Sequence, residues 1–323
     1  MSRPGAVPAA YCLLAILLQV PAGCSRDEAP PSTTPAAADT IVVYAAGIEV
    51  PGFAERVAAF SAATGIAVVL EQANGAQLVD AVIDHAGDPP ADVLLTDGVY
   101  EAFRAGSEGG LRPLAAEIPE ASVPAALRDP DGTWVAVAFE PTVIAYDAER
   151  VPTAALDGWE SLADAAFSGQ VCLSSSTLPG NRTLLATLIG DLGVRPAEIL
   201  VRKWLQNLAE PVYSSQAELV AAFAAGDCAA AIVTLEALAG IRDEASRDVG
   251  HIVPGPAVGD IIAAGVSRHA VRPEAANRFV AWLVETSALG DASAAEGMPV
   301  RNVAIGGWLA EDAMALARRA GYP

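Results

Sequence analysis

The sequence predicts an α/β protein of two lobes, each a mostly parallel sheet flanked by helices and joined by extended hinge crossings. Short β-branched runs alternate with helical patterns, an order typical of a parallel sheet covered on both faces. The length of 323 residues fits two units at about 150 residues per domain. Two long extended runs, at residues 135–146 and 260–266, are suited to chain crossings between the lobes.

The first half of the chain begins with a β-branched run at 41–44 (IVVY). Phe53, Val57 and Phe60 then recur at helical spacing, and Gly65 is suited to end that helix. The two patterns continue to alternate. We expect strands at 41–44, 66–70 and 93–96 and helices at 51–64 and 77–85.

The second half restarts the same alternation. Leu200, Trp204 and Leu208 recur every four residues, which predicts one face of a helix. We expect strands at 171–173, 211–213 and 229–233 and helices at 196–208, 217–225, 273–286 and 309–320.

Composition excludes several classes of function. The chain has 39 acidic and 19 basic residues and a net charge of -20, which repels phosphate backbones, so we expect no nucleic-acid partner. An apolar share of 53% excludes a disordered chain. The sequence contains no GxSxG, SxxK or HExxH motif, so an enzyme would depend on paired carboxylates, which ligand binding explains equally well.

The start of the chain resembles an export signal, which we assign to residues 1–23. The apolar run at 11–20 is shorter than the roughly 20 residues that cross a bilayer. It leads through Pro21 to Cys24, a pattern similar to a bacterial lipobox with Pro where Leu is usual. We expect a lipid on Cys24 and a flexible tether over 24–39, with secretion without a lipid as the alternative.

Two cysteines remain in the folded part of the chain. Of four Cys, Cys12 lies in the signal segment and Cys24 would carry the lipid. Cys172 and Cys228 are then an even pair in an oxidising compartment, which predicts a disulfide. Two reduced thiols that bind a soft metal are the alternative.

The order of segments resembles a known family. The segments are IVVYAAG, FAERVAAFSAATGIAVVLEQANG, GDPPADVLLTDG, LRDPDGTWVAVAFEPTVIAYD, AAFAAGDCAAAIVT and ALARRAGYP. Together they are similar to the periplasmic solute-binding proteins of ABC importers, in the ferric-iron-type branch. The resemblance implies a two-lobed clamshell that closes on its ligand and then docks on an importer permease. The lobe boundaries that it implies are 40–137 with 261–297, then 138–260, with 298–323 packing back on the lobes.

The resemblance breaks down at the iron ligands. Iron binders of this branch have adjacent tyrosines where this chain has TLEA at 234–237. The resemblance instead places four carboxylates at cleft-facing loops, and these are Glu49, Asp97, Glu140 and Glu236. Such a group of carboxylates favours a cation. The cation could be a metal ion held by Asp97 and Glu236, a polyamine or another ammonium compound. The alternative is that these positions arise by chance, because a chain with 39 acidic residues has several of them in loops. Glu236 would also suit the first turn of a helix, where a negative charge is favourable.

Further polar residues are candidate ligand contacts. A hydroxyl-rich loop follows the strand at 171–173 and is suited to an anion or a ligand oxygen, or else to a turn rich in capping hydroxyls. The candidates are Ser175, Ser176, Thr177, Arg182, Tyr213, Gln216 and Arg301.

We therefore expect an extracellular solute-binding lipoprotein, anchored in a bacterial periplasm or cell envelope, that delivers a small ligand to an ABC importer. The ligand is expected to be a cation such as ferric iron. The alternatives are an organic cation or phosphorylated metabolite, a sensor partner or metal chaperone of the same fold, and an enzyme. We expect a monomer with no cofactor beyond a metal ion as the transported ligand.

Overall fold

The computed structural model describes residues 39–46, 52–115, 118, 123–287 and 299–323. The assigned signal peptide, Cys24, all of the tether except Asp39, and Glu49 lie outside the described residues. None of the described helices is long and apolar enough to cross a membrane.

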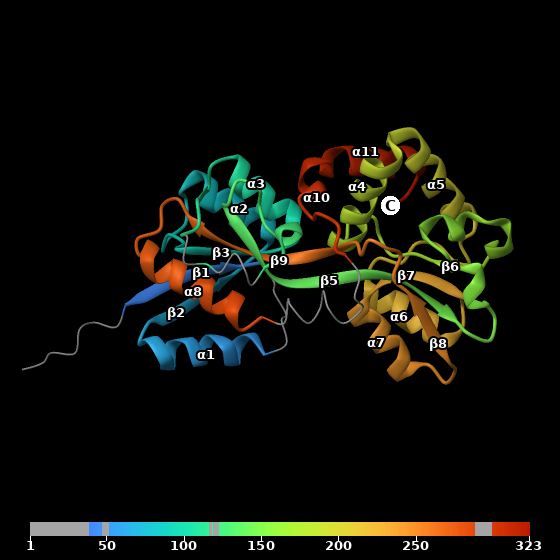
Figure 1. Cartoon of the computed structure of the whole chain (residues 1–323), viewed down its shortest axis with the longest axis horizontal. Helices are drawn as coiled ribbons and strands as arrows, with labels where there is room; N and C mark the ends of the chain where they lie inside the picture. The colour runs from blue at the N-terminus through green and yellow to red at the C-terminus, as the bar shows by residue number, and fades with distance from the viewer. Residues whose placement is uncertain (1–38, 47–51, 116–117, 119–122, 288–298) are drawn as a thin grey trace, which may run out of the picture. The chain divides into compact units, whose positions relative to one another are not determined.

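Strands and helices alternate along most of the described chain (Figure 1). The strands are β1 (Thr40–Ala45), β2 (Ala67–Gln72), β3 (Val93–Asp97), β4 (Leu111–Arg112), β5 (Trp134–Asp147), β6 (Val171–Cys172), β7 (Ala230–Thr234), β8 (Val249–Ile252) and β9 (Gly259–Ser267). The helices are α1 (Phe53–Thr64), α2 (Gly75–Asp84), α3 (Val99–Ser107), α4 (Pro179–Leu192), α5 (Val194–Gln206), α6 (Gln216–Ala225), α7 (Leu235–Glu244), α8 (Pro273–Glu285), α10 (Ile305–Trp308) and α11 (Ala310–Ala320).

The sheet of the first lobe is parallel at its outer edge. Strand β1 lies between β2 and β3 and runs parallel to both. Ile41 and Val43 of β1 are fully buried. Phe60 of α1 meets Phe279 of α8 edge to face, with ring centroids 5.0 Å apart. The helical spacing of Phe53, Val57 and Phe60 therefore predicts α1 correctly, and Gly65 ends the helix in the left-handed conformation, as expected.

Strands β5 and β9 serve both lobes. They run side by side and antiparallel (Figure 1), and their register places Glu140 opposite Asp260. Beyond that point β5 leaves β9 and pairs from Thr142 onward with β7, and from Ile144 onward also with β8. The strand order is β2-β1-β3-β9-β5-β7-β6. The two extended runs in the sequence are therefore the strands that connect the lobes.

The second lobe has a mixed sheet. Strand β7 is parallel to β6 but antiparallel to β5. The buried apolar side chains also separate by lobe, because one cluster contains Phe60 and Trp134 and two others contain Trp204 and Phe223. Each lobe therefore has its own core.

The last helices pack against both lobes. Helix α11 packs on α4 and α5, whereas α10 contacts α3 and α4. The approach of α10 is close, since a β-carbon added to Gly307 would lie 2.4 Å from Cβ of Phe103. Glycine is therefore needed where α10 meets α3.

Some sequence-based expectations are wrong. The strand predicted at 211–213 is absent, and Tyr213 forms only an isolated bridge with Ser174. The sequence patterns also give no bounds for α3, α4 or α7, although the expectation that Glu236 suits the first turn of a helix is confirmed in α7. In α4 the reason is that buried side chains lie around most of the helix, so no apolar stripe stands out.

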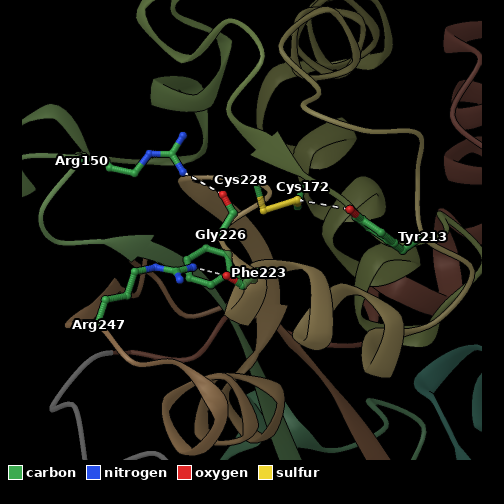
Figure 2. Close-up of a disulfide and its surroundings, with 7 residues drawn as sticks. All are labelled: Arg150, Cys172, Tyr213, Phe223, Gly226, Cys228 and Arg247. Atoms are coloured by element: carbon green, nitrogen blue, oxygen red, sulfur yellow. Dashed lines mark hydrogen bonds between the residues drawn. A yellow bond between two sulfur atoms is a disulfide. The ribbon is translucent and has the colours of Figure 1, made fainter.

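The expected disulfide is present. Cys172, at the end of β6, is bonded to Cys228, just before β7 (Figure 2). Both residues are fully buried.

Candidate functional site

Asp97 lies on a turn that reaches the other lobe. It ends β3 with its side chain exposed, and Gly98 follows with a φ of 113°, a conformation that favours glycine. A β-carbon added to Gly98 would lie 3.4 Å from Cβ of Pro179, at the start of α4. The turn that carries Asp97 therefore lies against the N-terminal end of α4.

Arg182 forms a second link between the lobes. Its Nη2 atom donates to Glu101 Oε2 of α3 at 3.0 Å, and its guanidinium lies 4.7 Å from the ring centroid of Tyr100. Burial raises the pKa of the Glu101 carboxyl, and the charge of Arg182 opposes that rise. Desolvation by the surrounding protein also raises the pKa of Asp97, although its side chain remains exposed, and the charge of Arg182 lowers that pKa. The positive charge of Arg182 therefore favours the ionised forms of Glu101 and Asp97. Of these two carboxylates, Glu101 is hydrogen-bonded to Arg182.

Glu140 and Glu236 form a carboxylate pair. Glu140 lies on β5, and its Oε1 accepts a hydrogen bond of 2.7 Å from the backbone N–H of Glu236, in the first turn of α7. Burial raises the pKa of Glu140, hydrogen bonds from the start of α7 lower it, and the charge of Glu236 raises it. Within the described ranges no Arg, Lys or His forms an ion pair with either carboxylate.

The hydroxyl-rich loop before α4 is largely held by the protein itself. Ser176 donates through its hydroxyl to the carbonyl of Tyr322 at 3.1 Å and through its N–H to the carbonyl of Pro323 at 2.7 Å. The Ser175 hydroxyl also donates to Pro323, at 3.1 Å, and lies 2.8 Å from the hydroxyl of Thr177. Ser176 is buried and Thr177 is exposed. Ser176 is therefore a structural residue in this arrangement, and Thr177 is the more accessible of the predicted contacts.

A polar cluster lies at the N-terminal turns of α4 and α6. The Ser174 hydroxyl accepts from Nδ2 of Asn181 at 3.0 Å and from Nε2 of Gln216 at 3.2 Å. In the described part of the chain, Oε1 of Gln216 and Oγ1 of Thr142 are buried without a hydrogen-bond partner. A β-carbon added to Gly180 would lie 3.2 Å from Thr142 Oγ1, so Thr142 faces the start of α4. The cluster therefore has unused hydrogen-bonding capacity.

Two predicted contacts point elsewhere. The hydroxyl of Tyr213 lies 4.0 Å from Sγ of Cys172 (Figure 2), and the hydroxyl is the donor because a disulfide sulfur has no proton. Arg301 forms an ion pair with Asp191. Asp191 is in the last turn of α4, roughly 13 Å along the helix axis from Arg182. The structure therefore places Arg301 away from the other candidates. Tyr213 does lie beside the hydroxyl-rich loop, since its backbone carbonyl accepts from the N–H of Ser175 at 2.8 Å, but its side chain points to the disulfide.

The predicted metal ligands come from different lobes. Asp97 follows β3 and Glu236 begins α7, and among the described residues no three His, Cys, Asp or Glu side chains are arranged to hold a metal ion. Glu49 lies outside that search. The lobe that carries Glu236 thus offers a pair of carboxylates, and Asp97 lies on the other lobe.

Three residues of the site escape the sequence patterns. Thr142 is a polar residue in the mostly apolar strand β5, two residues after Glu140, a signal that marks it once β5 is recognised as a central strand. Asn181 lies in the first turn of the unpredicted α4. Tyr322 donates to the Ser174 carbonyl at 2.7 Å, and no local pattern marks this contact because 148 residues separate the two.

The fold and this pair of facing lobes define a class of ligand-binding protein, and comparison with known proteins identifies it. The model of the family described as "Bacterial extracellular solute-binding protein" matches residues 55–307. The chain belongs to this family. The two-lobed α/β fold and the family expected from the sequence are therefore confirmed. The expectation of a mostly parallel sheet in each lobe is wrong, because the connecting strands β5 and β9 pair antiparallel with each other and with their neighbours β7 and β3.

Several relatives carry names that refer to iron. The chain is 28% identical to iron uptake protein A1 of Synechocystis sp. over 246 residues, which is 72% of this chain and 68% of that protein. A Trichodesmium protein (IdiA, FutA), solved with iron and citrate, matches with a TM-score of 0.77 and 24% identity over 88% of this chain and 100% of that one. A ferric binding protein of Campylobacter jejuni matches with a TM-score of 0.74 and 20% identity over the same shares.

Proposed function

We propose that the protein is the solute receptor of an ABC importer and that it carries ferric iron held by carboxylate oxygens. The observation that carries this proposal is the pair formed by Glu140 and Glu236, which has no cationic partner among the described residues. Holding two carboxylates together without a counter-charge is unfavourable, and a bound cation removes that cost.

The donor set suits a hard cation. Carboxylate oxygens prefer hard ions, and they would replace the phenolates that this chain lacks at 234–237. Asp97 of the first lobe would complete the ligand set from the opposite side, and Glu49 is a further candidate. The names of the relatives support iron as the ion.

A second candidate ligand is an anionic group. The unpaired Thr142 Oγ1 and Gln216 Oε1 lie at the N-terminal turns of α4 and α6. The Thr142 hydroxyl can donate to an oxygen of a small anion that accompanies the metal, or of a phosphorylated metabolite, whereas Oε1 of Gln216 can only accept from a protonated group of that ligand. An organic cation that binds the Glu140 and Glu236 pair is the remaining alternative.

The same proposal covers the cellular location of the protein and its partner. We propose that residues 1–23 direct export, that Cys24 carries the lipid, and that the monomer delivers its ligand to a permease. A sensor partner or a metal chaperone would use the same fold. Co-purification with a permease of the same cell envelope would separate these roles.

A titration of chelator-treated protein with ferric citrate tests the ligand. We expect saturable binding that weakens at least tenfold, or about 1.4 kcal/mol, in a Glu140→Gln, Glu236→Gln double variant. Glu244→Gln is the matched control, because Glu244 ends the same helix α7. Spermidine and inorganic phosphate are titrated in parallel. Binding of either without binding of ferric citrate would contradict the iron proposal.

A further inference from the structure

A buried carboxylate connects the two segments that carry the site. Asp260 lies at the start of β9 and is only 6% exposed. Its Oδ1 accepts from the N–H groups of Val99 and Ile261, both at 2.8 Å. Its Oδ2 accepts from the hydroxyl of Thr183 at 2.9 Å. Both oxygens therefore have partners, and the partners come from α3, β9 and α4.

The partners are adjacent in sequence to the candidate ligand contacts. Val99 begins α3 two residues after Asp97, and Thr183 follows Arg182 in the early part of α4. One carboxylate thus binds the segment after the predicted metal ligand of the first lobe and the helix turn of the second lobe. Both segments are therefore hydrogen-bonded to the same side chain.

Helix α10 covers this contact. A β-carbon added to Gly306 would lie 2.6 Å from Cγ1 of Val99 and 2.8 Å from Oγ1 of Thr183. The backbone of α10 therefore packs directly on both residues. The hydrogen bond between Thr183 and Asp260 is buried, so its loss cannot be replaced cheaply by water.

We propose that Asp260 is a positioning residue whose hydrogen bond with Thr183 holds the N-terminal turn of α4 against the turn that carries Asp97. In this arrangement the residue after Asp97, Gly98, lies against Pro179 at the start of α4. The effect on the lobes is independent of the ligand, whereas the effect on affinity rests on the proposed function. Losing the Thr183 hydroxyl lets the lobes separate, so ligand binding must then draw them together.

The chain offers a matched pair of variants. Thr183 and Thr187 are both buried in α4, one turn apart, at 2% and 3% exposure. The Thr187 hydroxyl donates to the carbonyl of Thr183 within the helix, so Thr187→Val removes a buried hydroxyl but no contact between the lobes. Thr183→Val removes the hydroxyl that reaches Asp260, and Thr183→Ser keeps it.

Small-angle scattering of the ligand-free protein is the first readout. We expect a larger radius of gyration in Thr183→Val than in wild type, with Thr187→Val and Thr183→Ser unchanged. Equal radii for Thr183→Val and Thr187→Val would overturn the proposal. If Thr183→Val does not fold, Thr183→Ala and Thr183→Ser are compared, and equal radii in those two proteins would overturn it instead.

Binding of ferric citrate is the second readout. We expect the dissociation constant to rise about tenfold in Thr183→Val, because a lost hydrogen bond to a charged group changes binding on that order, and to remain within twofold in Thr187→Val. The same rise in both variants would overturn the role in affinity. Wild-type protein that does not bind ferric citrate would overturn the proposed function, while the scattering result would still decide the role of Asp260.

Discussion

The backbone N–H of Glu236 donates to Oε1 of Glu140 at 2.7 Å. This contact joins β5, one of the two strands that connect the lobes, to the first turn of α7. Glu140 therefore has two roles that substitutions can separate. Its oxygen satisfies a backbone donor at a helix N-terminus, and its charge stands beside a second carboxylate.

Glu140→Gln is expected to preserve stability, whereas Glu140→Ala is expected to reduce it. The amide oxygen of Gln can still accept from Glu236, but Ala leaves that N–H without a partner, which costs about 1 kcal/mol. Urea denaturation of both variants measures the difference. Equal losses in the two variants would show that the charge of Glu140, and not its acceptor oxygen, stabilises α7.

Reduction of the disulfide is expected to lower stability strongly. Cys172 and Cys228 are 56 residues apart, and closing a loop of that length is worth about 4 kcal/mol in the chain-entropy model. The urea midpoint should therefore fall when dithiothreitol is added. A Cys172→Ser, Cys228→Ser variant is the control and should show a low midpoint with or without the reductant. A urea midpoint of the wild-type protein that is the same with and without dithiothreitol would contradict this prediction.

Local patterns predict much of the fold because they report burial. The β-branched run at β1 and the helical spacing of Phe53, Val57 and Phe60 each reflect one buried face, and both elements are found. The strand expected at 211–213 fails for a physical reason. Tyr213 pairs with the chain at one bridge only, and its side chain turns toward the disulfide.

The site is harder to predict than the fold, because its geometry depends on contacts between distant segments. The pairing of Glu140 with Glu236 follows from the register of β5 with β7. The sequence marks Glu236 as suited to the first turn of a helix, which is where it lies in α7, but no local pattern places Glu140 beside it. Arg301 shows the opposite case. Its position in a loop suggests a ligand contact, but it forms an ion pair with Asp191.

The contact of α10 with α3 predicts a sensitive glycine. A β-carbon at Gly307 would lie 2.4 Å from Cβ and Cγ of Phe103, so Gly307→Ala forces a shift and is expected to lower stability by about 1–3 kcal/mol. Gly240→Ala in α7 is the control, because its β-carbon would lie 3.5 Å from Val220, an ordinary contact. That change should leave stability unchanged or raise it by up to about 1 kcal/mol. Thermal unfolding of both variants measures the two effects. Equal melting temperatures for Gly307→Ala and Gly240→Ala would contradict the prediction.

The buried carboxylate of Asp260 predicts a dependence of stability on pH. Burial raises its pKa from 3.8 to about 6, against the opposing hydrogen bonds from Val99, Ile261 and Thr183. Because the folded state binds this proton more tightly than the unfolded state, the contribution to stability is present below about pH 4 and is lost as the pH rises through 6. The other carboxylates titrate in wild type and in D260N alike, so the difference between the two proteins isolates Asp260. We expect the free energy of unfolding of wild type, minus that of D260N, to fall between pH 4 and pH 6 by at most about 1.4 kcal/mol per pH unit and to be constant above pH 7. Urea denaturation at several pH values measures this difference, and a difference that rises with pH would show that Asp260 is stabilised as the anion.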